Sequence, residues 1–471
     1  MSSTFLDTAL NHEDNVILKI ISAALEIPEE QIDQDLSYQS VAQWDSLKHI
    51  KLMLALEKHY GFEIDEKAVL KLSSVNNIKE HVYQFKGLSS DNQKPIKNPQ
   101  PDKKKEIYRG LNEIYYDNSE ITYIDGQDGK LMHYGYGIND LFLHSTFEEV
   151  SYLLLNRRLP TRAELQEFSL SLSNKRVIKS SIIEFVHSIK SLHPAIVLRT
   201  VVSAYGLFTK KSDEDFIKEN LIAQLPGIIA AHHAIREGRE LLSPRPDLSH
   251  AANFLYLLRG EEPSLEEEEI FNQDLILHAD HGSNASTFVA RTVTGTQADI
   301  VSAVTAAISA FSGDLHGGAL EKVMIMIREI NSPDQVSSYI EERIKKNLPV
   351  FGYGHRVYRT EDPRAKSMRK AALKLSTIKN EFKWYQILEE INGVMSHYSK
   401  HGINVNVDFY AAIIYLLLGI PQDMFVSVFI MSRISGWIAQ ISEQKANNIL
   451  IRPRLNYIGP AEKTYQFIDQ R

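Results

Sequence analysis

The chain has 471 residues, of which 43% are hydrophobic and 24% are charged, a balance that excludes wholesale disorder. Cysteine is absent, which excludes disulfides, a thiolate nucleophile and Cys-ligated metal centres. The formal net charge of −8 gives no basic field, so we expect no nucleic-acid partner. The first residues carry acids and lack the basic start and apolar core of a secretory signal, and we therefore expect a cytoplasmic protein.

Residues 1–87 are predicted to form a small acidic module of helices joined by polar loops. They contain 14 Asp and Glu against 8 Lys. Apolar residues at helical spacing predict a helix over about 16–25. A second helix is predicted to begin at Ser46 and to end at Gly61, with Leu47, Ile50 and Leu54 forming its apolar stripe. The free N–H groups and the dipole at this helix N-terminus favour a phosphate on Ser46.

The segment Asp45-Ser46-Leu47, at the head of a helix in a small acidic module, resembles the acyl carrier protein family over about residues 10–86. The resemblance implies a four-helix fold with 4′-phosphopantetheine on Ser46. It also implies a phosphopantetheinyl transferase and an acyl-loading enzyme as partners. The alternative is that Ser46 is only an N-cap, because Ser and Asp cap helices routinely. Lys48, His49 and Lys51 stand where fatty-acid carriers usually present acids, which indicates different recognition partners.

Residues 88–105 are predicted to be a flexible or semi-extended linker. They contain three prolines and no aromatic residue, and they end in three lysines. Such a lysine run is more often solvated linker than a nucleic-acid patch.

Residues 106–471 are predicted to form a mainly α-helical body, because helical patterns dominate and few strands can be recognised. The most apolar run, Tyr410–Ile420, is too short to span a bilayer and predicts a buried core helix, so we expect no membrane association.

Six segments of the body place polar residues beside glycine-rich turns or apolar helices. In chain order they contain His281, His316, His355 with Arg364, Asp408, Arg433 and Arg452. Such a set suits carbon–carbon bond formation on an acidic substrate. A carboxylate flanked by Val407 and Phe409 is expected to be desolvated and hence more basic. A neutral histidine can donate a hydrogen bond to a developing enolate, and arginines bind carboxylates.

Two other kinds of site are conceivable for these segments. The histidine pair of His278-Ala279-Asp280-His281 could bind a metal, but no third ligand is evident and the spacing is not a recognised helical pair, so no metal is predicted. The Gly352-Tyr353-Gly354 segment follows no strand and lacks the third glycine of a dinucleotide site.

The ordered set resembles the citrate synthase family over roughly residues 107–465. The resemblance is carried by Asn284–Thr287, His316–Ala319, Gly352–Arg356 with Asp362–Arg364, Asn406–Asp408 and Arg452–Arg454. It implies an all-α homodimer whose subunits have large and small domains. By this resemblance Asp408 would remove the α-proton of an acyl thioester, His316 would stabilise the enol, and His355 would polarise the carbonyl of a 2-oxo acid. The carboxylates of the oxo acid would be held by His281, Arg364, Arg433 and, from the partner subunit, Arg452.

The sequence departs from the family pattern beside these positions. Gly282 replaces the usual Glu, Asp314 a Pro and Leu320 an Asn, and His133-Tyr134 replaces a Tyr-Arg pair. We therefore expect a carrier-fused acyltransferase that condenses an acyl thioester, either acetyl-CoA or a carrier-bound acyl group, with a 2-oxo acid such as oxaloacetate. Coenzyme A thioester is thus a candidate co-substrate. The alternative is a non-catalytic scaffold of the same fold that presents the carrier.

Overall fold

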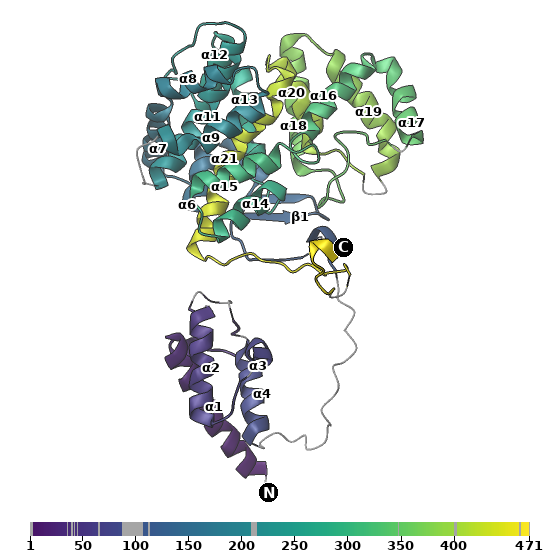
Figure 1. Cartoon of the computed structure of the whole chain (residues 1–471). Coiled ribbons are helices and arrows are strands. Elements are labelled where there is room, and N and C mark those ends of the chain that lie inside the picture. The colour runs from purple at the N-terminus through teal and green to yellow at the C-terminus, as the bar shows by residue number, and fades with distance from the viewer. Residues whose placement is uncertain are drawn as a thin grey trace. The chain divides into compact units, whose positions relative to one another are not determined.

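The computed structural model describes residues 3–34, 36–38, 41, 43–44, 46–64, 66–86, 107–111, 114–208, 214–346, 348–399, 403–460 and 463–470. The chain divides into two compact units, residues 1–116 with 448–471, and residues 117–447 (Figure 1). The predicted linker at 88–105 lies outside the described residues, as do the boundaries at 87 and 106, which stay predictions.

The described part of residues 3–86 forms the four-helix module that the sequence predicts. Its helices are α1 (Ser3–Leu25), α2 (Ser46–Tyr60), α3 (Glu66–Lys71) and α4 (Val75–Lys86), with a short 3-10 turn η1 (Glu29–Gln31) after α1. Their apolar faces meet in one core around the fully buried Trp44. Gly61 ends α2 with a φ of 77°, the left-handed conformation that glycine adopts at no steric cost.

The predicted apolar stripe of α2 is wrong at Leu54, whose side chain is 57% exposed. The buried face of α2 instead carries Leu52, Met53 and Leu56. At about 100° per residue, Leu54 lies roughly opposite both Leu52 and Leu56, so both faces cannot be buried. The side chains of Leu47 and Ile50 lie outside the described residues.

The larger unit is built almost wholly of helices, as predicted. Its described helices are α5 (Ile138–His144), α6 (Phe147–Asn156), α7 (Arg162–Lys175), α8 (Ser180–Ser188), α9 (Pro194–Ser203), α10 (Tyr205–Phe208), α11 (Glu214–Arg236), α12 (His250–Arg259), α13 (Leu265–His278), α14 (Ala285–Gly295), α15 (Ile300–Phe311), α16 (Ala319–Ile330), α17 (Val336–Lys345), α18 (Pro363–Lys379), α19 (Lys383–Ser399), α20 (Val407–Leu417) and α21 (Phe425–Ala446). It also contains a small antiparallel sheet that the sequence did not predict, in the order β1 (Thr122–Asp125), β2 (Lys130–His133), β3 (Tyr136–Gly137).

Side-chain caps begin three helices in or beside the predicted segments, α14, α18 and α20. Asn284 caps α14 by accepting from the Thr287 N–H, and Asp362 caps α18, where Pro363 occupies the first turn. Asn406 caps α20 by accepting from the Asp408 N–H. Each cap satisfies a backbone donor that would otherwise have no partner. Three of the polar segments that the sequence analysis singled out therefore contain helix starts.

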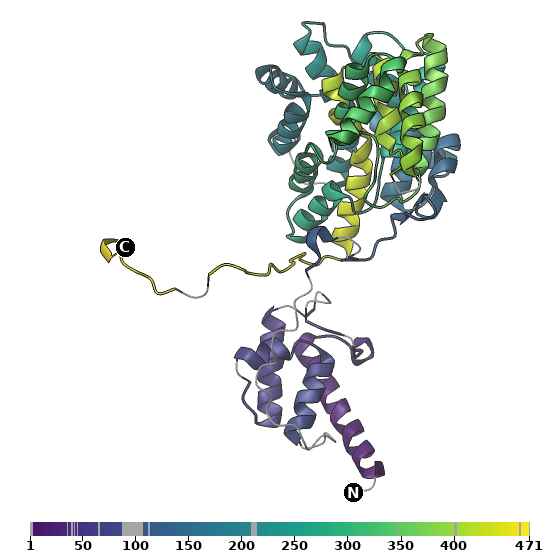
Figure 2. The ribbon, with the colours of Figure 1, turned by 90° about the vertical axis from the view of Figure 1, so that its right-hand side faces the viewer.

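Helix α21 lies at the centre of the larger unit. Figures 1 and 2 show it, in yellow, running through the middle of the other helices, with α16–α20 on one side and α7, α8, α11 and α12 on the other. By length and composition, the stretch Gln422–Ala446 could cross a membrane, but its apolar 18-residue part is fully buried inside the unit, as the core helix of a globular domain is. The predicted core run at 410–420 is also buried, in and just after α20.

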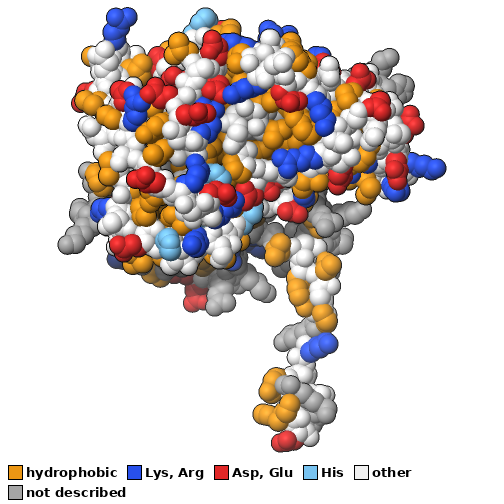
Figure 3. Space-filling view, turned by 90° about the horizontal axis from the view of Figure 1, so that it is seen from above, with side chains coloured by type: hydrophobic (Ala, Val, Ile, Leu, Met, Phe, Trp, Pro, Cys, Tyr) orange, Lys and Arg blue, Asp and Glu red, His pale blue; other side chains and the backbone are white. Residues whose placement is uncertain are grey.

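Charges are mixed on the face of the molecule seen from above. Figure 3 shows Lys and Arg side chains interspersed with Asp and Glu side chains there, with hydrophobic side chains between them. On this face no area of a single sign of charge stands out.

Candidate active site

The start of α2 is the predicted attachment point for a prosthetic group. Ser46 is the first residue of α2, and no acidic residue lies in the first turn of the helix. The side chain of Ser46 and all of Asp45 lie outside the described residues. The backbone therefore places Ser46 at a helix N-terminus, where unpaired N–H groups favour a phosphate ester.

The sequence analysis interpreted the basic residues after Ser46 as a sign of different recognition partners. The structure shows that not all of these side chains are available for contact with a partner. His49 is only 6% exposed. The Trp44 Nε1–H donates to His49 Nδ1 at 3.0 Å, so the ring proton is on Nε2, which donates to Val69 O at 3.0 Å. The Lys48 ammonium donates to Leu25 O at 2.9 Å and to Glu26 Oε2 at 3.0 Å. His49 is thus a buried structural residue, and Lys48 ties α2 to the end of α1.

In the larger unit, His281 and His355 lie side by side with Asp362. The ring centroids of the two histidines are 5.2 Å apart, and the ligand-type atoms of all three side chains lie within 4.8 Å of one another. His281 Nε2 is 3.0 Å from the Tyr358 hydroxyl. The fold thus supplies three neighbours of His281, namely His355, Asp362 and Tyr358, that sequence spacing did not reveal.

Backbone N–H groups determine which ring nitrogen of His355 carries the proton. The N–H groups of Val357 and Tyr358 donate to His355 Nδ1 at 3.0 and 3.1 Å. Burial lowers the pKa of His355 to about 4, so the ring is neutral near pH 7 and carries its proton on Nε2. His355 can therefore donate one hydrogen bond from Nε2 to a substrate oxygen.

Arginines make this pocket suitable for an anion. Arg364 is 3% exposed and donates from Nε and Nη2 to the two oxygens of Asp362, at 3.0 and 2.7 Å. These bonds use two of its five N–H donors and leave three. Burial lowers the pKa of His281 well below its usual range, with Arg364 and His355 acting in the same direction. A second cation would be unfavourable here, so the geometry fits a carboxylate better than a metal ion.

Arg433 lies at the centre of the predicted site residues. It is on α21, is 2% exposed, and donates from Nε to the backbone carbonyl of His278 at 2.6 Å. Burial lowers its pKa to about 10, which still leaves it cationic at neutral pH. Its charge also acts on the pKa values of His281, His316 and Asp408. The structure therefore gathers three other predicted residues around one guanidinium.

His316 follows α15 in a glycine-rich turn and is oriented by Ser286 at the start of α14. The backbone N–H and the hydroxyl of Ser286 approach His316 Nε2 at 3.4 and 2.9 Å. A backbone N–H can only donate, so Nε2 is the acceptor and the ring proton is on Nδ1. Burial lowers the pKa of His316 to about 4. His316 is then a neutral ring with an N–H available for a substrate oxygen.

Asp408 is the second residue of α20 and is partly buried. Burial raises its pKa to about 6, against the nearby positive charges of His278, Arg364 and Arg433. At neutral pH the carboxyl is mainly ionised and more basic than an exposed aspartate. This combination is what a general base needs.

Arg452 is not part of this cluster. It is exposed in the extended C-terminal segment, which groups with the other compact unit. Its predicted place in a site of the partner subunit stays a prediction. The sequence analysis missed two residues, Ser286, which stands inside the quoted segment Asn284–Thr287, and Tyr358, which follows the quoted segment Gly352–Arg356 by two residues, so their signal was proximity to the predicted histidines.

The residues that depart from the family pattern each have defined surroundings in the structure. Gly282 has a φ of 53°, a left-handed conformation that favours glycine, and a Cβ there would lie 3.2 Å from Ile124 Cδ1. Asp314 is exposed and pairs with Lys322 at 3.1 Å, while Leu320 is buried in the core. His133 is buried on β2 and lies 2.9 Å from the Thr122 hydroxyl.

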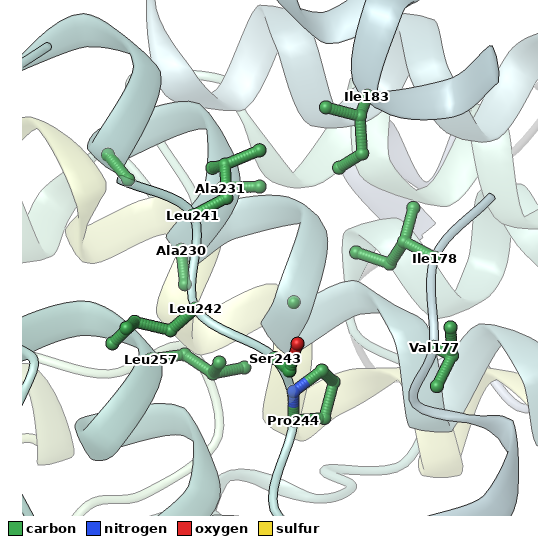
Figure 4. Close-up of a pocket in the computed structure, with 12 residues that line it drawn as sticks. Val177, Ile178, Ile183, Ala230, Ala231, Leu241, Leu242, Ser243, Pro244 and Leu257 are labelled. Carbon is green, nitrogen blue, oxygen red and sulfur yellow. The ribbon is translucent and has the colours of Figure 1, made fainter. Parts of the chain in front are cut away.

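A separate apolar pocket of about 210 Å³ lies away from these residues. Figure 4 shows it between α8, α11, α12 and the segment at 241–244, with Ala230, Ala231 and Leu257 on its wall. None of the predicted site residues lines it.

Comparisons with known proteins cover both parts of the chain. The family profile described as citrate synthase, C-terminal domain, matches residues 110–454, and the profile for the phosphopantetheine attachment site matches residues 15–82. The chain is 42% identical to citrate synthase 2 of Bacillus subtilis over 371 residues, which is 77% of this chain and 99% of that protein. It is 36% identical over 378 residues to 2-methylcitrate synthase 1 of Corynebacterium glutamicum, covering 78% of this chain and 99% of that protein.

Solved structures agree with this relationship. A citrate synthase from Thermoplasma acidophilum, in a ternary complex with carboxymethyl coenzyme A and oxaloacetate, superposes with a TM-score of 0.74 at 31% identity. The match covers 78% of this chain and 100% of that one. The citrate synthase from Thermotoga maritima gives a TM-score of 0.72 at 33% identity, over 78% of this chain and 99% of that one.

Proposed function

The chain belongs to the citrate synthase family, and from that premise we propose that its larger unit condenses an acyl thioester with a 2-oxo acid and then hydrolyses the condensed thioester. The observation that carries the proposal is the cluster of His281, His316 and Asp408 around Arg433, with His355 beside His281. It combines one carboxylate of raised pKa with two neutral histidines, each of which has an assigned ring proton.

The proposed first step uses Asp408 and His316. The Asp408 carboxylate accepts the α-proton of the donor, and the electrons of the broken C–H bond move onto the thioester oxygen. The His316 Nδ1–H donates a hydrogen bond to that oxygen. A neutral donor suits this role, because it stabilises the developing charge without trapping an ion pair.

The proposed second step uses the anion pocket. His281, Arg364 and Arg433 hold the carboxylates of the oxo acid. The His355 Nε2–H polarises the keto oxygen, so that the donor α-carbon attacks the keto carbon and a new C–C bond forms. The electrons of the keto C=O double bond move onto its oxygen, which takes the His355 proton, and the thioester carbonyl re-forms. Water then adds to that carbonyl, and the thiol leaves. The relatives of the chain include both citrate and 2-methylcitrate synthases, which supports a short acyl donor and a dicarboxylic oxo acid such as oxaloacetate.

The smaller unit is a carrier module, and we propose that Ser46 carries 4′-phosphopantetheine. The helix N-terminus at Ser46, with no acid in the first turn, fits an attached phosphate. When bound, the group supplies a thiol on which an acyl group is held as a thioester. The donor or the product would then be tethered to the same chain, at a high effective concentration. A phosphopantetheinyl transferase and an acyl-loading enzyme would be its partners.

The test is thiol release with and without oxaloacetate, for acetyl-CoA, for propionyl-CoA and for the acylated full-length protein. Asp408→Asn should lower kcat by about 10²–10⁴-fold, because it removes the general base and keeps the shape. Ser46→Ala is the matched control, since it should lose only the reaction of the tethered donor. If the wild-type protein releases no thiol from any of the three donors, with or without oxaloacetate, the non-catalytic scaffold would be favoured.

A further inference from the structure

The asparagine at the start of α20, Asn406, contacts two segments of the proposed site at once. Its side-chain Oδ1 accepts from the Asp408 N–H at 3.1 Å, which caps the helix that carries the proposed base. Its side-chain Nδ2 donates to Gly354 O at 3.1 Å. Gly354 is the residue before His355. One side chain therefore connects the backbone beside the base to the backbone beside the polarising histidine.

The partners fix the orientation of the Asn406 amide. A backbone N–H can only donate and a carbonyl oxygen can only accept, so the amide oxygen must face Asp408 and the amide nitrogen must face Gly354. Neither contact depends on the charge of any group. Because both hydrogen bonds come from one planar amide, moving the Gly354 loop away from α20 breaks at least one of them.

The backbone holds the same two segments together. The Asn406 N–H donates to Gly352 O at 2.9 Å, and the Gly354 N–H donates to Asn404 O at 2.8 Å. These two bonds do not depend on the side chain at position 406. The Asn406 side chain adds a third bond, at the end of the loop that leads into the polarising histidine.

Close packing joins this loop to α20. Gly352 has a φ of 83°, and a Cβ there would lie 2.5 Å from Phe409 Cδ2, so the loop approaches the helix as closely as a glycine allows. The Tyr353 and Phe409 rings pack edge to face, with centroids 5.1 Å apart. The Asp362 N–H donates to Val405 O at 3.2 Å, which joins the anion pocket to the same segment. The residues just before α20 therefore connect the base, the loop of the polarising histidine and the anion pocket.

We propose that Asn406 is a positioning residue that sets the place of His355 relative to Asp408 through the two hydrogen bonds of its amide. The inference rests on the proposed roles of those two residues. Formation of the C–C bond needs the enol and the polarised keto carbon in close alignment, and a displacement of about 1 Å can slow such a step by about 100-fold. Removal of the α-proton needs Asp408 but not this alignment. Loss of the bond to Gly354 should therefore slow condensation more than proton removal.

The experiment uses Asn406→Ser in the full-length protein. Serine is as good an N-cap as asparagine, so it keeps an acceptor for the Asp408 N–H, but it lacks the amide N–H that reaches Gly354 O. In heavy water with acetyl-CoA and oxaloacetate, mass spectrometry measures the deuterium in the recovered donor and the amount of condensed product. The ratio of donor deuteration to product should rise by about 10- to 100-fold over wild type, because the enol forms and then reverts.

Asn272→Ser is the matched control. Asn272 lies on α13 and makes the same pair of contacts elsewhere, since its Oδ1 accepts from the Phe147 N–H at 2.8 Å and its Nδ2 donates to Ser145 O at 3.2 Å. It should keep the wild-type ratio, although it loses an equivalent bond. A wild-type ratio in folded Asn406→Ser overturns the proposal, whether the two rates are unchanged or fall together.

A second measurement needs no turnover. Amide hydrogen exchange of the peptide that contains Gly354 should become about 10-fold faster in Asn406→Ser, the effect of losing roughly one hydrogen bond, while the interior amides of α20 keep their rates. Asn406→Asp also keeps the cap and loses the donor, and it should show the same change. Unchanged exchange in both variants overturns the proposal. A wild type that neither deuterates nor condenses its donor refutes the proposed function, and hydrogen exchange then still decides whether Asn406 holds the loop.

Discussion

At the scale of single residues, the site depends on where two protons sit. Backbone N–H groups at Val357 and Tyr358 fix the ring of His355, and Ser286 fixes the ring of His316. Burial keeps both histidines neutral near pH 7, with pKa values of about 4. Each histidine then presents one N–H, which is a donor for an enolate or keto oxygen. The neighbours of the histidines, and not only the histidines, therefore set the chemistry.

We expect Ser286→Ala to slow turnover by about 3- to 10-fold, the effect of losing roughly one hydrogen bond. The Ser286 hydroxyl contacts His316 at 2.9 Å and accepts from the Trp437 indole at 3.2 Å, so its loss frees the ring that must donate to the enolate. Steady-state kinetics should show the loss in kcat, with the KM of the oxo acid unchanged. Ser188→Ala, at an exposed serine of α8, should match wild type. A change in KM alone would assign Ser286 to oxo-acid binding instead.

The residue types of the site were predictable from the sequence, but its contacts were not. The quoted segments contain His281, His355 and Asp408. That His281 meets His355 and Tyr358 depends on how distant segments pack, which spacing along the chain does not encode. The structural reason for Gly282 is likewise local backbone geometry, a φ of 53° beside Ile124.

At the scale of elements, helical spacing predicted α2, the end of α1 and the core helix near residues 410–420, but it placed the start of α1 near residue 16, whereas the helix begins at Ser3. It failed on the small sheet, because strands of four, four and two residues are shorter than the run in which alternation can be recognised. It also failed on the buried face of α2, where Leu54 is exposed and Met53 is buried. In a short apolar helix, several stripes fit the sequence, and packing against the neighbouring helices selects one of them.

The N-terminus of α2 makes a specific prediction about modification. Treatment with a phosphopantetheinyl transferase and coenzyme A should add one phosphopantetheine arm to the intact protein, as measured by mass spectrometry. Ser46→Ala should abolish the addition. Ser74→Ala is the matched control, because Ser74 accepts from the Asn77 N–H at the start of α4 and is equally a helix-start serine. An arm that persists in Ser46→Ala would place the attachment elsewhere.

At the scale of the whole molecule, the C-terminal segment is the feature that favours an interface with a second chain. Its apolar side chains are open to solvent in the single chain, with Leu455 99%, Tyr457 76% and Ile458 90% exposed. Apolar surface of this kind is typically covered by another protein. Together with the family position of Arg452, this supports a homodimer in which each chain completes the site of the other.

A mixture of two inactive variants tests the shared site. Arg452→Ala and Asp408→Ala chains, mixed and allowed to exchange subunits, should recover about a quarter of the wild-type activity, because half of the dimers are hybrids and each hybrid has one intact site. The control replaces Asp408→Ala with the double variant Asp408→Ala, Arg452→Ala, which can form no intact site. Recovery of no activity, with exchange verified by mass, would place Arg452 in the site of its own chain.

The burial of α21 along its length has a consequence for hydrogen exchange. Its central amides, around Ile434 and Trp437, are covered on all sides by the larger unit and can meet solvent only when that unit opens as a whole. Their exchange rates therefore report the global unfolding free energy of residues 117–447, whereas amides of the carrier helices report only the smaller unit. One exchange experiment on the intact chain thus separates the stabilities of the two units without cutting them apart.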